Sequence, residues 1–219
     1  LRRILRLQPR ARTLLDIGAG AGALVRQARD LGLDAAGVEP SLSLVRSAAR
    51  INGVQLLQGR LPHPAIEDRK FDIITIIDVI EHVSDPVDLL RHAAEALEPD
   101  GMLVVVTPDL GSFAAKFLKQ RWWHFRFAHV GYFNRATLLM AADRTGLRAI
   151  QVGRPTSYFT IEYVTDRLQR YVPIGAIVRF ARMLPASAWL YSRVVPVNPR
   201  DSLIVFLQRQ DWTGGDGHA

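Results

Sequence analysis

The fold is decided by residues 13–39, which read TLLDIGAGAGALVRQARDLGLDAAGVE. The short apolar run from Thr13 to Ile17 predicts a buried strand, and apolar side chains recur at helical spacing from Ala21 to Leu31. Three glycines lie where the strand passes into the helix, namely Gly18, Gly20 and Gly22. Glycines at such a point let a ligand approach the backbone and the positive end of the helix. This stretch therefore predicts a βα unit with a ligand-binding loop.

The same alternation of strand and helix continues along the chain. Further strands are expected at Ala35–Val38, Val54–Leu57, Phe71–Ile77, Met102–Thr107, Leu147–Val152 and Asp201–Arg209. Further helices are expected at Leu42–Ile51, Pro86–Leu97 and Thr137–Thr145, with a turn at Pro99-Asp100-Gly101 before the fifth strand. This order is typical of an α/β protein with a Rossmann-like, mostly parallel sheet.

Prolines and dispersed arginines interrupt the pattern after residue 152. We expect a Rossmann-like core at 1–152, a helical lid inserted at 153–199 between strands six and seven, the final core strand at 200–210 and a disordered tail at 211–219. Within the lid, apolar residues such as Ile174, Ile177 and Val178 fall on one helical face with arginines between them. The lid either packs on its own domain or offers a basic amphipathic surface to anionic lipid.

Composition excludes several classes of protein. The 219 residues include no cysteine, so disulfides, thiolate metal sites and cysteine nucleophiles are ruled out. The mean hydropathy is +0.06, and no apolar run approaches the roughly 18 residues that a membrane-spanning helix needs. The net charge of +7 does not by itself predict a nucleic-acid target, because the acidic content is ordinary.

The glycine loop fits two kinds of ligand. Gly18-x-Gly20-x-x-Ala23 satisfies a dinucleotide fingerprint, with Glu39 about 20 residues further on as the ribose-binding acid. Asp16, at the tip of the first strand, decides between them. Its carboxylate would repel a pyrophosphate, whereas it would attract a ligand with an amino group and a cationic sulfur.

Three segments together give the chain a resemblance to the class I S-adenosylmethionine-dependent methyltransferases, within the ubiquinone-biosynthesis-type and methyltransferase 23-like branch. They are LLDIGAGAGALVRQARDLGLDAAGVEPS (14–41), FDIITIIDVIEHVSDPVDLLRHAAEALEPDGMLVVVTPD (71–109) and HVGYFNRATLLMAADRTGL (129–147). The resemblance implies a seven-stranded sheet whose last strand is antiparallel, and S-adenosylmethionine as the cofactor.

It also implies roles for single residues on the cofactor side. Gly18, Gly20 and Gly22 would border the methionine part of the cofactor, Asp16 its amino group, and Glu39 the two ribose hydroxyls. Gly59, Arg60 and Leu61 would lie beside the adenine, with Arg60 standing where many relatives have an acidic side chain. Asp78 and Val79 would lie at the cleft between cofactor and acceptor.

On the acceptor side, the resemblance places two histidines that are candidates for the catalytic base, His82 and His129, each of which could instead anchor a loop. Aromatic residues after the fifth strand are expected to form the acceptor pocket or to pack as core, and the candidates are Trp122, Trp123, His124 and Tyr132. The histidines and acids have no HExxH or comparable spacing, so no metal site is predicted.

We therefore expect a methyltransferase that acts on a small molecule, by O-methylation of a quinone, sugar or lipid-linked intermediate. The signature Asp/Asn-Pro-Pro-aromatic of base methylation is absent after the fourth strand, which argues against nucleic acid. Two alternatives remain: an NAD(P)-dependent oxidoreductase, and a non-catalytic cofactor-binding or assembly protein. We expect a cytoplasmic location, with the lid as a peripheral membrane contact.

Overall fold

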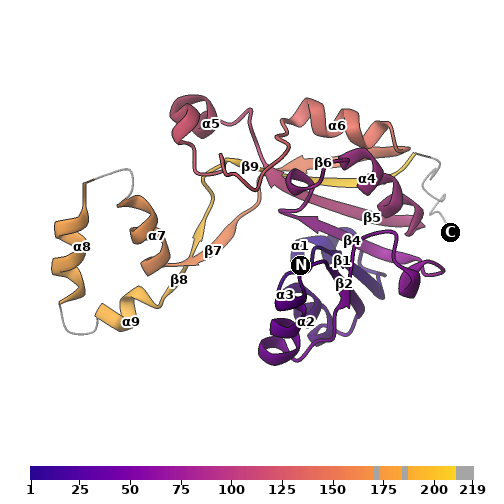
Figure 1. Ribbon diagram of the computed structural model, residues 1–219, viewed down its shortest axis with the longest axis horizontal. Coiled ribbons are helices and arrows are strands. Elements are labelled where there is room, and N and C mark those ends of the chain that lie inside the picture. Colours follow the sequence, from indigo (N-terminus) through magenta and orange to yellow (C-terminus); the bar gives the residue numbers. More distant parts are fainter. Residues whose placement is uncertain (170–172, 184–186, 211–219) are drawn as a thin grey trace. The chain divides into compact units, whose positions relative to one another are not determined.

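The structure, a computed structural model, describes residues 1–169, 173–183 and 187–210. The described chain divides into two compact units, one of residues 1–154 with those from 200 on and the other Pro155–Pro199. The first unit contains a seven-stranded sheet and the second a two-stranded sheet (Figure 1). The tail expected at 211–219 lies outside the described residues.

The large sheet has the strand order β3-β2-β1-β4-β5-β9-β6. Its strands are β1 Thr13–Ile17, β2 Asp34–Glu39, β3 Leu57–Gln58, β4 Phe71–Ile77, β5 Leu97–Pro108, β6 Leu147–Gly153 and β9 Ser202–Arg209. The pairs from β3 to β5 are parallel, whereas β9 is antiparallel to both β5 and β6. The predicted Rossmann-like sheet with an antiparallel last strand is confirmed.

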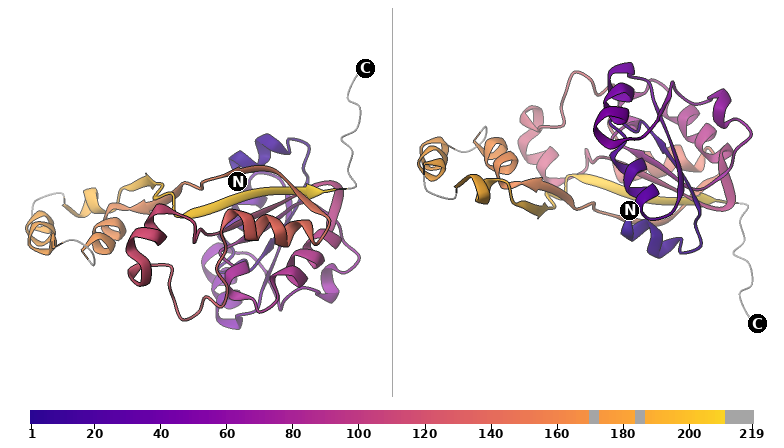
Figure 2. Two further views of the ribbon diagram at one scale, coloured as in Figure 1. Left: turned by 90° about the horizontal axis from the view of Figure 1, so that it is seen from above. Right: turned by 90° about the horizontal axis from the view of Figure 1, so that it is seen from below.

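Helices cover both faces of this sheet, as the two views in Figure 2 show. They are α1 Arg2–Leu7, α2 Ala23–Asp30, α3 Leu42–Ser47, α4 Pro86–Glu95 and α6 Arg135–Asp143. The core unit also has α5 Phe113–Leu118, which contributes no residue to the core clusters, and the short helices η1 Ala48–Asn52, η2 Pro64–Ile66, η3 Ile80–His82 and η4 Lys119–Arg121. Because neighbouring strand residues point to opposite faces, Leu15 packs in one core cluster with α4 and α6, and Leu14 packs in another with α1 and α2.

Several element boundaries differ from the prediction by a few residues, and β5 and β3 differ for identifiable reasons. The residues Pro99-Asp100-Gly101 lie inside β5 and not in a turn before it. The buried pair Phe71 and Leu97 begins the β4–β5 ladder early, and a register shift between Phe71 and Ile73 accommodates the extra residues. Strand β3 also lies later than predicted, at Leu57–Gln58, because only two of its residues pair with β2.

The insertion, Pro155–Pro199, has a hairpin and helices of its own. Strand β7 Ser157–Thr160 pairs antiparallel with β8 Val194–Val197, and between them lie α7 Ile161–Leu168, α8 Gly175–Arg182 and α9 Ser187–Tyr191. The helical character expected of this segment is therefore present, while the hairpin was not predicted. Among the described residues, no helix is both long enough and apolar enough to cross a membrane.

Candidate active site

The glycine loop connects the end of β1 to α2. Gly18, Gly20 and Gly22 all have positive φ angles, of 72°, 55° and 77°, a region that favours glycine. A Cβ atom on Gly18 would lie 2.3 Å from Cγ2 of Val79, whereas a Cβ on Gly20 would meet no atom within 4 Å. Gly18 is thus required by close packing against the residues that follow β4, and Gly20 leaves its backbone open to a ligand.

Glu39 ends β2 and is buried at 6% exposure. Its Oε2 accepts the backbone N–H of Gly20 at 2.9 Å, and its Oε1 accepts that of Ser41 at 2.9 Å. Each carboxylate oxygen can accept a further hydrogen bond. Glu39 therefore fixes the glycine loop and still has two acceptor positions, as two ribose hydroxyls require.

The predicted adenine-side residues follow β3, next to Glu39. The backbone N–H of Gly59 donates to the carbonyl of Glu39 at 3.1 Å. Arg60 is exposed and Leu61 is half-buried. The structure thus brings this segment to the same edge of the sheet as the glycine loop.

Asp16 is a buried carboxylate near the end of β1. The hydroxyl of Thr75 donates to its Oδ1 at 2.6 Å. Burial raises the pKa of Asp16 from 3.8 to about 7; the negative charge of Glu39 adds to the rise and the Thr75 hydrogen bond opposes it. A bound cation would favour the ionised form.

These residues fit the S-adenosylmethionine that the sequence predicted. Glu39 offers acceptors to hydroxyls, Asp16 offers a carboxylate to an ammonium group, and Gly20 offers open backbone. A dinucleotide fits less well, because its pyrophosphate would meet the buried acidic group of Asp16 beside the glycine loop.

The acceptor side begins at Asp78, directly after β4. Asp78 has a φ of 53°, which is uncommon for a residue other than glycine, and its backbone N–H donates to the carbonyl of Val106 at 2.9 Å. Burial raises the pKa of Asp78, and the electrostatic interactions with His124, His82 and Arg126 oppose the rise. Asp78 therefore lies among the basic residues of the acceptor side.

Three proton-accepting side chains meet next to it: Glu81, His82 and His129. One ligand atom of each lies within 4.8 Å of the other two. Glu81 is 1% exposed; its Oε2 accepts the hydroxyl hydrogen of Thr107 at 2.9 Å, while its Oε1 has no partner among the described residues. We call these three residues the acceptor triad.

The two histidines of the triad have their lone pairs available. Nδ1 of His82 lies 2.8 Å from the carbonyl of Ala128, so it carries the proton and leaves the lone pair on Nε2. Nδ1 of His129 is buried without a partner in the described chain. Burial, together with the neighbouring His82, His124 and Arg126, lowers the pKa of His129 to about 4. His129 is therefore neutral near pH 7.

The triad could hold the hydroxyl of an acceptor or, as two imidazoles and a carboxylate, a divalent cation. The sequence predicted no metal because these residues do not have a local metal-binding spacing. Glu81 was not a candidate either, and only its position beside His82 at the end of β4 hinted at a role. The fold brings together residues 48 positions apart in the chain.

The aromatic residues predicted to line the acceptor pocket differ in their exposure. Trp122 is 1% exposed, with its ring against those of His124 and Phe125 at 5.1 and 5.4 Å. Trp123, His124 and Tyr132 are half-buried, and Nε2 of His124 lies 3.1 Å from Oδ2 of Asp201. Trp122 thus packs inside the loop, as the alternative interpretation of the cluster anticipated, and the other three remain accessible.

Comparison with known proteins identifies the class. Residues 1–152 match the family model described as a methyltransferase domain, methyltransferase 23, so the chain belongs to this family. It is similar to two proteins named ubiquinone biosynthesis O-methyltransferase. The one from Azorhizobium caulinodans is 34% identical over 99 residues, 43% of this chain and 39% of that protein. The one from Bradyrhizobium sp. strain ORS 278 is 33% identical over 129 residues, 54% of this chain and 44% of that protein. The aligned part thus spans less than half of each relative.

Solved structures agree on the fold. A SAM-dependent methyltransferase from Archaeoglobus fulgidus matches with a TM-score of 0.59 and 17% identity, over 95% of this chain and 92% of that chain. Magnesium protoporphyrin IX methyltransferase from Synechocystis with bound SAH matches with a TM-score of 0.60 and 14% identity, over 94% and 78%. The predicted S-adenosylmethionine-dependent methyltransferase class is confirmed at the level of the family, and the oxidoreductase alternative is set aside.

Asp16 makes stability depend on pH in a defined direction. Its pKa is raised in the folded state, so its contribution is fully present below pH 3.8 and is lost as the pH rises towards 7. Relative to Asp16→Asn, which stays neutral and keeps an acceptor for Thr75, the ligand-free parent should lose at most about 4 kcal/mol of unfolding free energy over this range. Urea unfolding at several pH values measures the difference, and parallel pH profiles for the two proteins would contradict it.

Glu39 should support both the loop and the cofactor. Glu39→Ala removes charge-assisted acceptors worth roughly 1.5 to 3 kcal/mol each, so affinity for S-adenosylhomocysteine should fall on the order of 10- to 100-fold. It also leaves the N–H groups of Gly20 and Ser41 without an acceptor, which should lower the melting temperature. Glu39→Gln should lower the affinity for S-adenosylhomocysteine and the melting temperature less than Glu39→Ala does. Asp34→Ala, at the other end of β2, is the control, and an unchanged dissociation constant in folded Glu39→Ala would refute the assignment.

Proposed function

We propose that this protein transfers the methyl group of S-adenosylmethionine to a hydroxyl oxygen of a small molecule, of the quinone, sugar or lipid-linked kind. The acceptor triad carries the proposal. Glu81 Oε1 and His129 Nδ1 are buried acceptors without a donor in the described chain. Burying such atoms unpaired costs free energy, so a hydroxyl donor from the substrate is the natural partner.

Bound S-adenosylmethionine supplies an electrophilic methyl group on a sulfonium. The chain's part is to hold the acceptor oxygen in line with that methyl group and to take the hydroxyl proton. As the oxygen–carbon bond forms, the carbon–sulfur bond breaks with its electron pair on sulfur. His129 is neutral because its pKa is lowered to about 4, and its Nδ1 has no partner in the described chain, so a lone pair is free to receive the proton. The same low pKa makes it a weak base, so the proton moves as the oxygen–carbon bond forms and the hydroxyl becomes strongly acidic.

The names of the curated relatives support transfer to oxygen, since both are called O-methyltransferases of ubiquinone biosynthesis. The half-buried Trp123, His124 and Tyr132 would form the wall against which a ring of the acceptor packs. Asp78 and Val79 would separate the cofactor from the acceptor, because Val79 packs against Gly18 and Asp78 lies among the basic residues near the triad.

His129→Ala tests the proton-accepting role. Turnover should fall on the order of 10²- to 10⁴-fold, the usual value of general base catalysis, while affinity for S-adenosylhomocysteine stays unchanged. The measurement is transfer of a labelled methyl group to catechol, to a reduced quinone and to a small-metabolite extract. His92→Ala, a histidine of α4, is the control.

Three other results of these assays would change the proposed function. A normal rate in folded His129→Ala would remove the residue from the reaction. Loss of parent activity on treatment with a chelator, restored by a divalent metal, would mean that the triad holds a cation. Binding of S-adenosylhomocysteine without any methyl transfer would favour the non-catalytic alternative.

We also propose a cytoplasmic protein whose insertion makes a peripheral contact with anionic membranes. On α8, Ile177 and Phe180 are 69% and 68% exposed, while Val178 is buried. Trp189 on α9 is 60% exposed, with the Arg193 guanidinium 4.2 Å from its ring centroid. Exposed apolar and aromatic side chains next to arginines are typical of helices that lie at a lipid surface.

The full chain should co-sediment with phosphatidylglycerol vesicles and not with phosphatidylcholine vesicles, and salt should weaken the binding. Ile177→Ser/Phe180→Ser should reduce the partition coefficient at least about tenfold, because each buried side chain contributes roughly 1.5 to 3 kcal/mol. The control is Ile51→Ser/Met140→Ser, at two exposed positions of the core unit. Equal binding to both lipids, or none, would overturn this proposal.

A further inference from the structure

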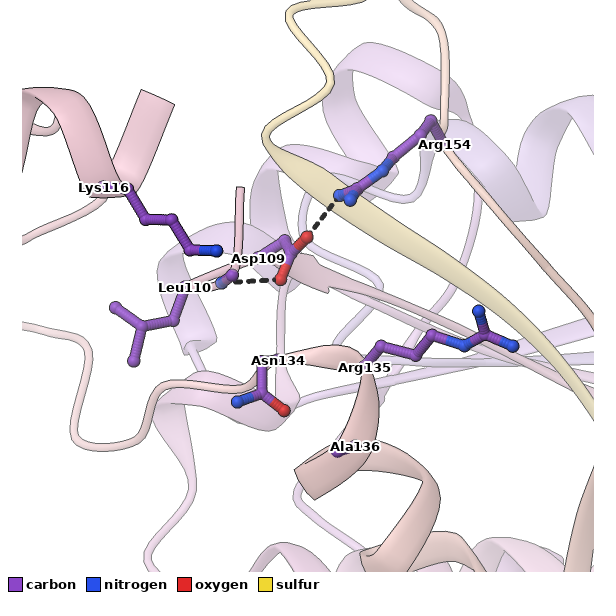
Figure 3. Close-up of a pocket in the computed structure, with 8 residues that line it drawn as sticks. Asp109, Leu110, Lys116, Asn134, Arg135, Ala136 and Arg154 are labelled. Carbon is purple, nitrogen blue, oxygen red and sulfur yellow. Dashed lines mark hydrogen bonds and ion pairs between the residues drawn. The ribbon is translucent and has the colours of Figure 1, made fainter. Parts of the chain in front are cut away.

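A second concave site lies in the core unit, at the end of β5. It is a pocket of about 520 Å³ formed by the segment after β5, helix α5, the start of α6 and the segment after β6 (Figure 3). Its polar lining consists of Asp109, Lys116, Asn134 and Arg135 together with Arg154. None of these was a candidate site residue from the sequence.

The one acidic group of the lining is already neutralised. Asp109 is 2% exposed, its Oδ2 forms an ion pair with the Arg154 guanidinium, and its Oδ1 accepts the backbone N–H of Gly111 at 2.8 Å. Figure 3 shows Lys116 and Arg154 both extending towards Asp109. The carboxylate thus positions Arg154 and does not cancel the other cations.

Lys116 and Arg135 have no ion pair or hydrogen bond of their side chains within the part of the chain that the structure describes. With Asp109 and Arg154 compensating each other, two positive charges remain in the lining: Lys116 extends towards Asp109, and the Arg135 guanidinium is directed away from it, on the other side of the pocket (Figure 3). Asn134 forms a capping box with Thr137, so of the first turn of α6 only the backbone N–H groups of Arg135 and Ala136 are left to a ligand, together with the positive end of the helix dipole. The pocket is therefore suited to an oxyanion.

The sequence around the pocket also has an excess of positive charge. From residue 110 to 142 the chain has no aspartate or glutamate, and five residues there are cationic, Lys116, Lys119, Arg121, Arg126 and Arg135. This stretch makes most of the pocket and also carries His129. A positive field of this kind attracts an anionic ligand before contact.

We infer that this pocket binds a phosphate or carboxylate group carried by the methyl acceptor. The inference rests on the proposed function, because it takes the triad as the place of the reacting hydroxyl. The two sites share one loop: the N–H groups of Val130 and Gly131 donate to the carbonyl of Glu81, and that of Leu110 donates to Phe133. His129 and Arg135 are six residue steps apart, which span at most about 21 Å, so a molecule of about this length or shorter can reach both sites.

The test uses calorimetric titration of the full chain with inorganic phosphate and, separately, with citrate, at constant ionic strength. The parent should bind at least one of them at millimolar concentration, and the preferred anion tells phosphate from carboxylate. Lys116→Ala/Arg135→Ala should weaken that binding at least about tenfold, since two charge-assisted contacts are lost. Arg144→Ala, an exposed arginine at the other end of α6, should change it less than about twofold.

The result is independent of methyl transfer. S-adenosylhomocysteine should bind the parent and all variants alike, so a failure of the proposed function would appear there or in turnover, and a failure of the pocket only in the anion titrations. If Arg144→Ala weakened anion binding as much as the double variant, the binding would reflect the general positive charge of the protein and not a specific site. Parent protein that binds neither anion up to about 10 mM, or a double variant that binds as the parent does, would overturn the inference.

Discussion

Parallel pairing of β2, β1, β4 and β5 is the constraint on which the candidate site depends. Because these strands run in one direction, the residues that follow them gather at one edge of the sheet. Hydrogen bonds between neighbouring strand ends fix this edge, from Gly59 to Glu39, from Gly18 to Val38 and from Asp78 to Val106. Side chains far apart in the sequence thereby meet within hydrogen-bonding distances.

Several carboxylates are buried at this edge, among them Asp16, Glu39 and Glu81. Burying a charge without enough hydrogen bonds or an opposite charge is unfavourable. The three acids differ in how many hydrogen bonds they accept. Glu39 accepts two backbone N–H groups, Asp16 accepts a single hydroxyl hydrogen, and Glu81 keeps one oxygen unpaired. Apolar side chains at these positions would stabilise the core more. The presence of buried acids is therefore explained by ligands that supply the hydrogen bonds and charges they lack.

The sequence was sufficient to predict the order of strands and helices, and it placed the candidate cofactor residues in one βαβ unit, because each of these signals is local. Thr13–Ile17 and Phe71–Ile77 were predicted with their observed bounds, and Asp16, Gly20 and Glu39 belong to one βαβ unit. The acceptor side depends on tertiary contacts. Nothing local indicates that Glu81 meets His129 or that Arg154 neutralises Asp109. The turn residues 99–101 were misassigned because the pairing of Phe71 with Leu97 overrides their local preference.

The charge distribution across the cleft matches the chemistry of methyl transfer. The loops after β1 and β2 carry Asp16 and Glu39, whereas residues 110–142 carry cations and no acid. The first side favours a ligand with positive charge and the second a ligand with negative charge. Methyl transfer to a hydroxyl converts the sulfonium to a neutral thioether and releases a proton, and the unpaired Nδ1 of the half-buried, neutral His129 has a lone pair for it. Its low basicity follows from burial and from the same surrounding cations that attract an anionic acceptor.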